Sequence, residues 1–254
     1  MIEIGRQYWG VLRMRLVFRR IRSMTKRRLI HWVARLEPMH YKRSRELIFW
    51  HFLLRSDLRH INLRGLAIAM RSLREQPARI IETGTSAWGT DSTRLWASYV
   101  DAFGGELWSV DIRSEAGSAL GGLGPNVHLE VGDSVQFLET FRERSGVKVE
   151  LAYLDSWDVD WSDPFPSAAH GLAEWRALQP LLRAGSIVVV DDTPVSERLI
   201  PADFRIRAEA FRREHGVLPG KGAFVLLDLL ERSDVEVLYH HYNLVLRLSD
   251  GSLP

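Results

Sequence analysis

The chain lacks cysteine, so neither disulfide bonds nor thiolate metal sites are available to its 254 residues. It also lacks any run of about eighteen apolar residues and any signal-peptide pattern. We therefore expect no membrane-spanning helix, and we expect a cytoplasmic location, with which the missing cysteine is consistent. A hydrophobic content of 46% over this length is enough for one sizeable α/β core.

Acidic residues are scarce at the start of the chain. Residues 1–80 contain 19 Lys and Arg against 5 Asp and Glu, whereas residues 81–254 contain 15 against 27. The small net charge of +2 therefore hides a basic head and an acidic body.

The basic head, residues 1–36, mixes aromatic and aliphatic residues with cationic ones in a way typical of amphipathic helix. Such a helix can lie on an anionic membrane surface, which makes this segment a candidate for peripheral membrane contact. The alternative is a helix packed on the domain with a solvated basic face. Because no recognition motif accompanies the basic residues, nucleic acid is not expected as a partner.

Two further helical patterns, residues 45–55 and 63–74, follow the basic head, and Pro77 ends this region. We expect these helices to cover one edge of a sheet and its ligand loop. The chain is thus divided into a basic helical extension and cap, residues 1–76, and a main domain, residues 77–254.

The stretch from Ile80 to Thr90 is an apolar run that breaks into a glycine-containing loop, and residues 92–100 continue as a helix. Loops at the carboxyl end of a parallel strand are where open α/β sheets bind nucleotides. A phosphate loop is not expected, because Thr90 and Asp91 follow Gly89 where its lysine should stand. The dinucleotide fingerprint also fails, because Ser86 has a side chain where the backbone must approach a pyrophosphate.

Glu82, at the entrance of this loop, suits a cationic or amine-bearing adenosyl ligand better than a polyphosphate. The alternative is a glycine turn that is only structural. A second strand, residues 106–111, ends in Asp111, which can accept hydrogen bonds from ribose hydroxyls or cap the next helix. After a third strand, residues 127–131, Asp133 and Ser134 open a helix, where an N-cap is the simple interpretation.

Acidic residues also end two later apolar strands, residues 149–155 and 185–192. The helical pattern between them makes these strands parallel neighbours, so Asp155, Asp191 and Asp192 should meet at one end of the sheet. Three carboxylates this close repel one another unless a cation neutralises them, and oxygen ligands favour Mg²⁺, Mn²⁺ or Ca²⁺. The alternative is that the acids only mark strand ends and cap helices.

Together these motifs resemble those of class I S-adenosylmethionine-dependent methyltransferases of the metal-dependent O-methyltransferase type, which includes the catechol and macrolide deoxysugar methyltransferases. The resemblance covers about residues 79–195. It implies an α/β fold with a Rossmann-like, doubly wound, mostly parallel seven-stranded sheet and a closing antiparallel hairpin, which residues 220–248 fit.

The resemblance also assigns the site. Mg²⁺ (or Mn²⁺) would be held by Asp155, Asp191 and Asp192. S-adenosylmethionine would be bound by residues of the three loops described above, namely Glu82, Gly84, Thr85, Ser86, Gly89, Asp111, Asp133 and Ser134. The glycine loop is longer than the E-x-G-x-x-x-G usual in such proteins.

In those relatives a His or Lys base stands three residues after the first metal acid, and here that position is Asp158. Asp158 and Asp155 are therefore the candidate catalytic residues, and Asp160 can share the role of Asp158. His170, His240 and His241 are weaker candidates, since lone histidines are more often structural.

The predicted reaction is methyl transfer to a hydroxyl of a sugar or another vicinal diol, in a small-molecule or glycan acceptor. Two alternatives stay open: an enzyme like the antibiotic-pathway hydroxylases on the same scaffold, or a non-catalytic module that contacts membrane or nucleic acid. The sequence does not decide whether the chain forms a homo-oligomer.

Overall fold

The computed structural model describes residues 41–86 and 89–249. The basic head, with its predicted membrane contact, lies outside the described residues, as do Ala87 and Trp88 of the glycine loop. In the described part of the chain, no helix combines the length and the apolar character needed to cross a membrane.

Seven strands form one sheet in the order β3-β2-β1-β4-β5-β7-β6. β1 to β5 pair in parallel, and β7 is antiparallel to both β5 and β6. The predicted Rossmann-like sheet with a closing hairpin is therefore confirmed. The strands are β1 (Ala78–Thr83), β2 (Gly105–Asp111), β3 (Val127–Val131), β4 (Leu151–Leu154), β5 (Ile187–Val190), β6 (Val235–His240) and β7 (Leu244–Leu248).

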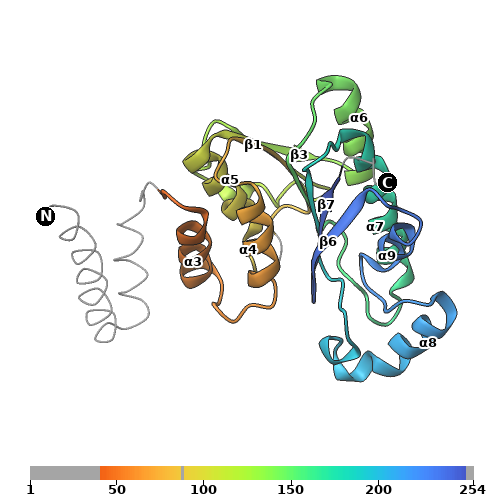
Figure 1. Ribbon diagram of the computed structural model, residues 1–254. Helices are drawn as coiled ribbons and strands as arrows, with labels where there is room; N and C mark the ends of the chain where they lie inside the picture. Colours follow the sequence, from red (N-terminus) through yellow and green to blue (C-terminus); the bar gives the residue numbers. More distant parts are fainter. Residues whose placement is uncertain (1–40, 87–88, 250–254) are drawn as a thin grey trace, which may run out of the picture. The chain divides into compact units, whose positions relative to one another are not determined.

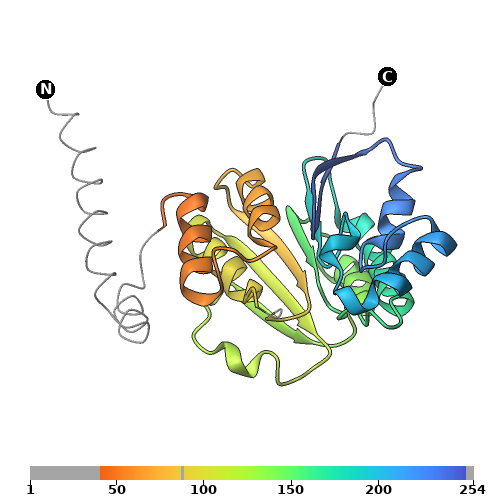
Figure 2. The same cartoon turned by 90° about the horizontal axis from the view of Figure 1, so that it is seen from below.

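Helices cover both faces of the sheet (Figure 1). One face is covered by α3 (Ser44–Arg55), α4 (Leu63–Ser72) and α5 (Ser92–Phe103). The other is covered by α6 (Ser134–Ser145), α7 (Phe165–Leu178) and α9 (Ala223–Leu229). The same two layers are visible in the turned view (Figure 2), where the connection between β5 and α9 includes α8 (Arg205–His215). Short 3₁₀ turns lie at Ser118–Leu120, Gln179–Leu181, Glu197–Leu199 and Ala202–Phe204.

The central strands of the sheet are buried on both sides, because their residues alternate between two apolar layers. Ile80 and Ile187 belong to the layer under α3, α4 and α5, while their neighbours Ile81 and Val188 belong to the layer under α6, α7 and α9. Burial on both faces explains why the central strands are continuous apolar runs in the sequence.

The cap helices α3 and α4 share the first of these layers with the sheet. Leu47, Phe52, Leu66 and Met70 are buried in it. The predicted hairpin boundaries need one correction: the hairpin begins at Val235, and the residues from Gly220 form a loop and then α9. A hydrophobic run after a glycine loop does not by itself distinguish a buried helix from a strand.

Candidate active site

The glycine loop between β1 and α5 packs tightly against its neighbours. Gly84 has φ +85°, and a Cβ built on it would lie 2.3 Å from the carbonyl oxygen of Asp155. The amide of Gly84 donates to Val110 O at 2.8 Å, and the amide of Asp155 donates to Thr83 O at 2.9 Å. Only a glycine permits this approach, so the loop is fixed across the ends of β2 and β4.

Two non-glycine residues of the loop have left-handed backbone: Ser86 with φ 58° and Asp91 with φ 49°. Such conformations cost free energy and persist only where the surroundings impose them. The helix α3 and the residue after it supply part of that constraint, because His51 Nε2 lies 2.6 Å from Thr90 O and the hydroxyl of Ser56 donates to Gly89 O. The cap thus holds the outer end of the loop.

Glu82, the second-last residue of β1, lies beneath the loop and is completely buried. Its Oε2 accepts hydrogen bonds from Thr93 Oγ1 at 2.5 Å and Ser109 Oγ at 2.6 Å. Burial raises the pKa of Glu82 to about 7, although these hydrogen bonds oppose the shift. The structure therefore places Glu82 where it supports the loop from inside.

Asp111 ends β2, and its carboxylate faces the glycine loop. Its Oδ2 accepts from the amide of Thr85 at 3.0 Å, and its two oxygens accept from the guanidinium of Arg113 at 3.0 and 2.8 Å. Burial acts to raise the pKa of Asp111, but the hydrogen bonds from Arg113 outweigh it and the pKa is lowered. The next residue, Ile112, is 74% exposed, so apolar surface is available beside the carboxylate.

Asp133 and Ser134 open α6 but have different surroundings. Asp133 is exposed, and its Oδ1 accepts from the amide of Gln136 at 2.9 Å, which confirms the N-cap. It also lines a cavity of about 410 Å³ together with Val110 and Phe137. Ser134 is buried, with its Oγ 3.0 Å from Nε2 of His170 on α7.

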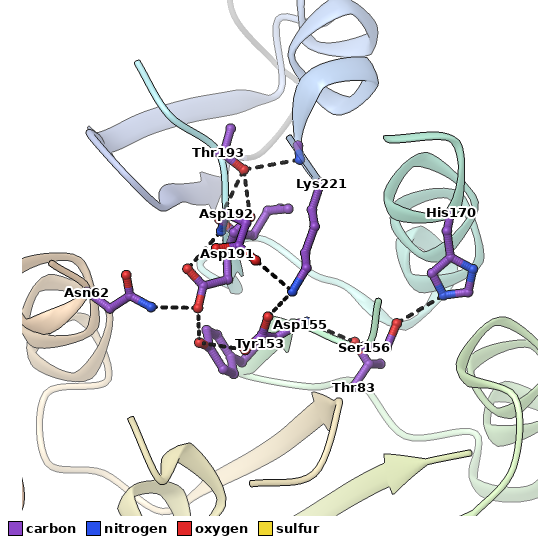
Figure 3. A network of polar contacts seen from close by, with 12 residues as sticks. Asn62, Thr83, Tyr153, Asp155, Ser156, His170, Asp191, Asp192, Thr193 and Lys221 are labelled. Atoms are coloured by element: carbon purple, nitrogen blue, oxygen red, sulfur yellow. Dashed lines mark hydrogen bonds and ion pairs between the residues drawn. The ribbon is translucent and has the colours of Figure 1, made fainter. Parts of the chain in front are cut away.

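The three predicted acids meet at one end of the sheet in a single polar network (Figure 3). Tyr153, the buried third residue of β4, directs its hydroxyl to Asp191 Oδ2 and lies 3.2 Å from Asp155 Oδ2. The ammonium of Lys221 donates to Asp155 Oδ1 and lies 3.1 Å from Asp192 Oδ2. We call Asp155, Asp191, Asp192, Tyr153 and Lys221 the acidic network.

Burial and the charge of Asp192 raise the pKa of Asp191 to about 6, although Lys221 opposes the shift. Burial alone would lower the pKa of Lys221, but the three carboxylates outweigh it and raise the pKa above its usual value. Lys221 is therefore charged at neutral pH.

A divalent ion does not fit this arrangement. Mg²⁺ requires oxygen ligands in near-octahedral geometry. Among residues 41–86 and 89–249, no group of three Asp, Glu, His or Cys side chains is arranged to hold a metal ion. The carboxylates instead bind an ammonium, a phenol and an amide.

Sequence reasoning missed Lys221, Tyr153 and Asn62. Asn62, the residue before α4, donates from Nδ2 to Asp191 Oδ2 at 2.6 Å. The only signal in the sequence was Lys221 itself, a cation between two glycines. Tyr153 looked like one more strand residue, and nothing local marks Asn62.

The other predicted residues are not members of this network. Asp158 is exposed, and its charged neighbour is Arg113. Asp160 is exposed and accepts from Ser162, so it shapes a turn. His240 lies 3.1 Å from Thr193 O, next to the acidic pair.

His170 belongs to a second polar group on α7. Its Nε2 lies 2.9 Å from Ser156 Oγ, and Ser156 donates to Glu174 Oε1 at 2.7 Å. Since Ser134 and Glu174 both approach His170 through the same nitrogen, Nε2, this group is not arranged as a Ser-His-acid triad.

Sheet order, glycine loop and strand-end acids together define the class I S-adenosylmethionine-dependent methyltransferase fold, and comparison with solved structures agrees. The MycE methyltransferase of the mycinamycin biosynthetic pathway, solved with Mg, SAH and mycinamycin VI, matches with a TM-score of 0.58 and 18% identity. The match covers 82% of this chain and 55% of that one, so this chain spans about half the length of MycE.

An O-methyltransferase from Bacillus cereus, solved with SAH, matches with a TM-score of 0.51 and 14% identity over 87% of this chain and 97% of that one. No family model and no curated protein sequence matches the chain. At these identities the structural similarity establishes the fold, as the resemblance in sequence predicted.

Proposed function

We propose that the protein is an S-adenosylmethionine-dependent O-methyltransferase that acts on a hydroxyl of a sugar or another vicinal diol. The observation that carries this proposal is the hydrogen bond from the amide of Thr85 to the carboxylate of Asp111. It places the glycine loop beside an ionised carboxylate at the end of β2. In nucleotide-binding α/β folds a carboxylate in this place binds ribose hydroxyls.

The residues present fit S-adenosylmethionine. Asp111 can accept from the ribose once the half-exposed side chain of Arg113 shares or leaves it. Ile112 offers an apolar surface for the adenine, and Asp133 lies on the cavity that opens beside β3. Gly84 and Ser86 shape the loop that would face the methionine part, with Glu82 supporting it from below. When bound, the cofactor supplies a methyl group on a sulfonium, which an acceptor oxygen takes by in-line displacement.

The acceptor hydroxyl must lose a proton as the new C–O bond forms. Asp155 and Asp191 already accept hydrogen bonds within the acidic network, so their oxygens are committed. Asp158 is exposed and is not a member of the acidic network. Asp158 is therefore the better proton acceptor, with Asp155 in a positioning role.

The similarity to MycE, whose complex contains mycinamycin VI, supports a small-molecule acceptor. The exposed carboxylate of Asp158 suits a hydroxyl group, which can donate a hydrogen bond to it. The expected divalent ion is not part of this proposal, because the acidic network does not fit it.

The test is release of the demethylated cofactor from S-adenosylmethionine in the presence of diol-bearing acceptors, followed by chromatography. We expect release that depends on the acceptor, with turnover reduced about 100-fold or more in Asp158→Asn and cofactor affinity unchanged. Asp163→Asn, a change at another exposed acid of the same connection, is the matched control. Wild-type turnover in Asp158→Asn would show that another group takes the proton.

A further inference from the structure

The backbone around Lys221 packs closely against its neighbours at three glycines. A Cβ on Gly220 would lie 2.2 Å from Asp192 O, and one on Gly222 would lie 2.4 Å from Thr193 Oγ1. A Cβ on Gly171 of α7 would lie 2.2 Å from the carbonyl oxygen of Lys221 itself. Glycine at these three positions lets the backbone of Lys221 approach both α7 and the end of β5.

Hydrogen bonds hold the same backbone in place. The amide of Lys221 donates to Asp192 O at 3.0 Å, and the amide of Gly222 donates to Thr193 Oγ1 at 3.1 Å. Asp192 has left-handed backbone with φ 42°, a conformation that costs free energy. The backbone that positions Lys221 in the acidic network is therefore fixed by hydrogen bonds and close packing.

The side chain of Lys221 is only 4% exposed, and that of Asp155 is 9% exposed. A buried ammonium is costly unless carboxylates pair with it, and three carboxylates this close repel one another unless a cation lies among them. The pairing of Lys221 with the carboxylates thus lowers the free-energy cost of placing either group in this site.

Asp191 is held by neutral donors on both of its oxygens. Oδ1 accepts from the amide of Asp192 at 2.8 Å, and Oδ2 accepts from Asn62 and Tyr153. No oxygen of Asp191 is thus left without a donor, and Lys221 spans the other two acids. The network is complete without a further cation.

We propose that Lys221 is the resident cation of this site, which supplies the positive charge that a divalent ion would supply and allows the site to work without a metal ion. The proposal deepens the proposed function, and it rests on that function for what the site does with an acceptor. An ammonium has three N–H donors, of which two are used by Asp155 and Asp192. The third is the group that can donate to an acceptor oxygen.

The choice of cation can be tested without knowing the acceptor. The full-length protein is titrated with Mn²⁺, and free Mn²⁺ is measured by electron paramagnetic resonance, for the wild type and for Asp191→Asn. We expect that the wild type has no stoichiometric Mn²⁺ site. Asp191→Asn should then bind no less Mn²⁺ than the wild type does. One Mn²⁺ per wild-type chain, lost in Asp191→Asn, would overturn the proposal, and this comparison does not depend on any variant at Lys221.

A second Mn²⁺ titration, on variants of Lys221, tests whether this lysine takes the place of a metal ion. Lys221→Ala should gain one Mn²⁺ site, at least about tenfold tighter than any in the wild type, and adding Asp191→Asn should remove it. Lys148→Ala, which truncates an exposed lysine bonded to Pro180 O, should behave as the wild type. A folded Lys221→Ala that binds no Mn²⁺ would overturn the proposal, because the carboxylates would then not form a cation site.

Calorimetry with S-adenosylmethionine on the same samples separates this proposal from the proposed function. A wild type that binds neither Mn²⁺ nor the cofactor, with Mn²⁺ gained in Lys221→Ala, would contradict the proposed function and support Lys221 as the cation. A wild type that binds both would overturn the role of Lys221 and leave the proposed function standing.

Discussion

The amide of Asn62 donates to the carboxylate of Asp191 at 2.6 Å, across 129 positions of the sequence. Both side chains are buried, with exposures of 4% and 3%. This contact joins the start of α4 to the end of β5, so the cap is part of the acidic site and not only a cover for the sheet.

We expect Asn62→Ala to lower the free energy of unfolding by about 1.5–3 kcal/mol, because it removes a buried hydrogen bond to a charged group. Asn62→Asp should cost more, since it places a like charge beside Asp191. Urea unfolding near neutral pH measures both, with Asn126→Ala at an exposed position as the control. A loss in Asn62→Ala no larger than in the control would show that this contact contributes nothing to stability.

Asp111→Ala should weaken binding of S-adenosylmethionine by about 1–3 kcal/mol, or roughly 5- to 150-fold, because hydrogen bonds from the ribose to a charged group are lost. Isothermal titration calorimetry measures the change. Asp101→Ala, at an exposed acid on α5, is the control and should bind as the wild type. Equal affinities of Asp111→Ala and the control would remove Asp111 from the cofactor site.

Glu82 makes stability depend on pH in a definite direction. Its pKa is about 7 in the folded protein and 4.5 in the unfolded chain, so the folded state binds more protons and stability falls as pH rises between these values. The loss is complete above about pH 7. The variant Glu82→Gln has no ionisable group at this position, so its stability does not fall with pH for this reason.

Relative to the wild type, Glu82→Gln should therefore gain stability between about pH 5 and pH 8, by on the order of 2–3 kcal/mol. Urea unfolding at the two pH values gives the difference, and Glu139→Gln on the exposed face of α6 should show none. A pH-independent effect of Glu82→Gln would mean that burial does not raise the pKa of Glu82.

The basic head is predicted from sequence to bind anionic surfaces. A protein that begins at residue 37 should lose its partition onto anionic lipid vesicles while it keeps its affinity for S-adenosylmethionine, and added salt should weaken the partition of the full chain. Sedimentation with vesicles measures both. Equal partition of the two proteins would leave packing on the domain as the role of this segment.

The strands and their terminal acids could be predicted from sequence because both are local features. Each central strand is an apolar run, and each acid follows its run directly, as Asp111 follows Val110 and Asp191 follows Val190. Parallel pairing then brings the acids to one end of the sheet, which the structure confirms for Asp155, Asp191 and Asp192.

The cation of the site could not be predicted in the same way. Lys221 contacts Asp155 across 66 positions, and its approach depends on Gly171 of α7 as well as on its own glycine neighbours. Sequence patterns describe which face or end a residue occupies, but they do not describe which distant side chain meets it. For this reason the acids alone suggested a metal ion, whereas the structure supplies an ammonium.

The most direct test of the account is a calorimetric titration of the full chain with S-adenosylmethionine, performed once with excess EDTA and once with Mg²⁺. The account predicts one cofactor per chain with the same affinity in both conditions, because the glycine loop and Asp111 bind the cofactor and Lys221 stands in place of a divalent ion. Binding in neither condition would contradict the proposed function, and binding that requires Mg²⁺ would contradict the metal-free site.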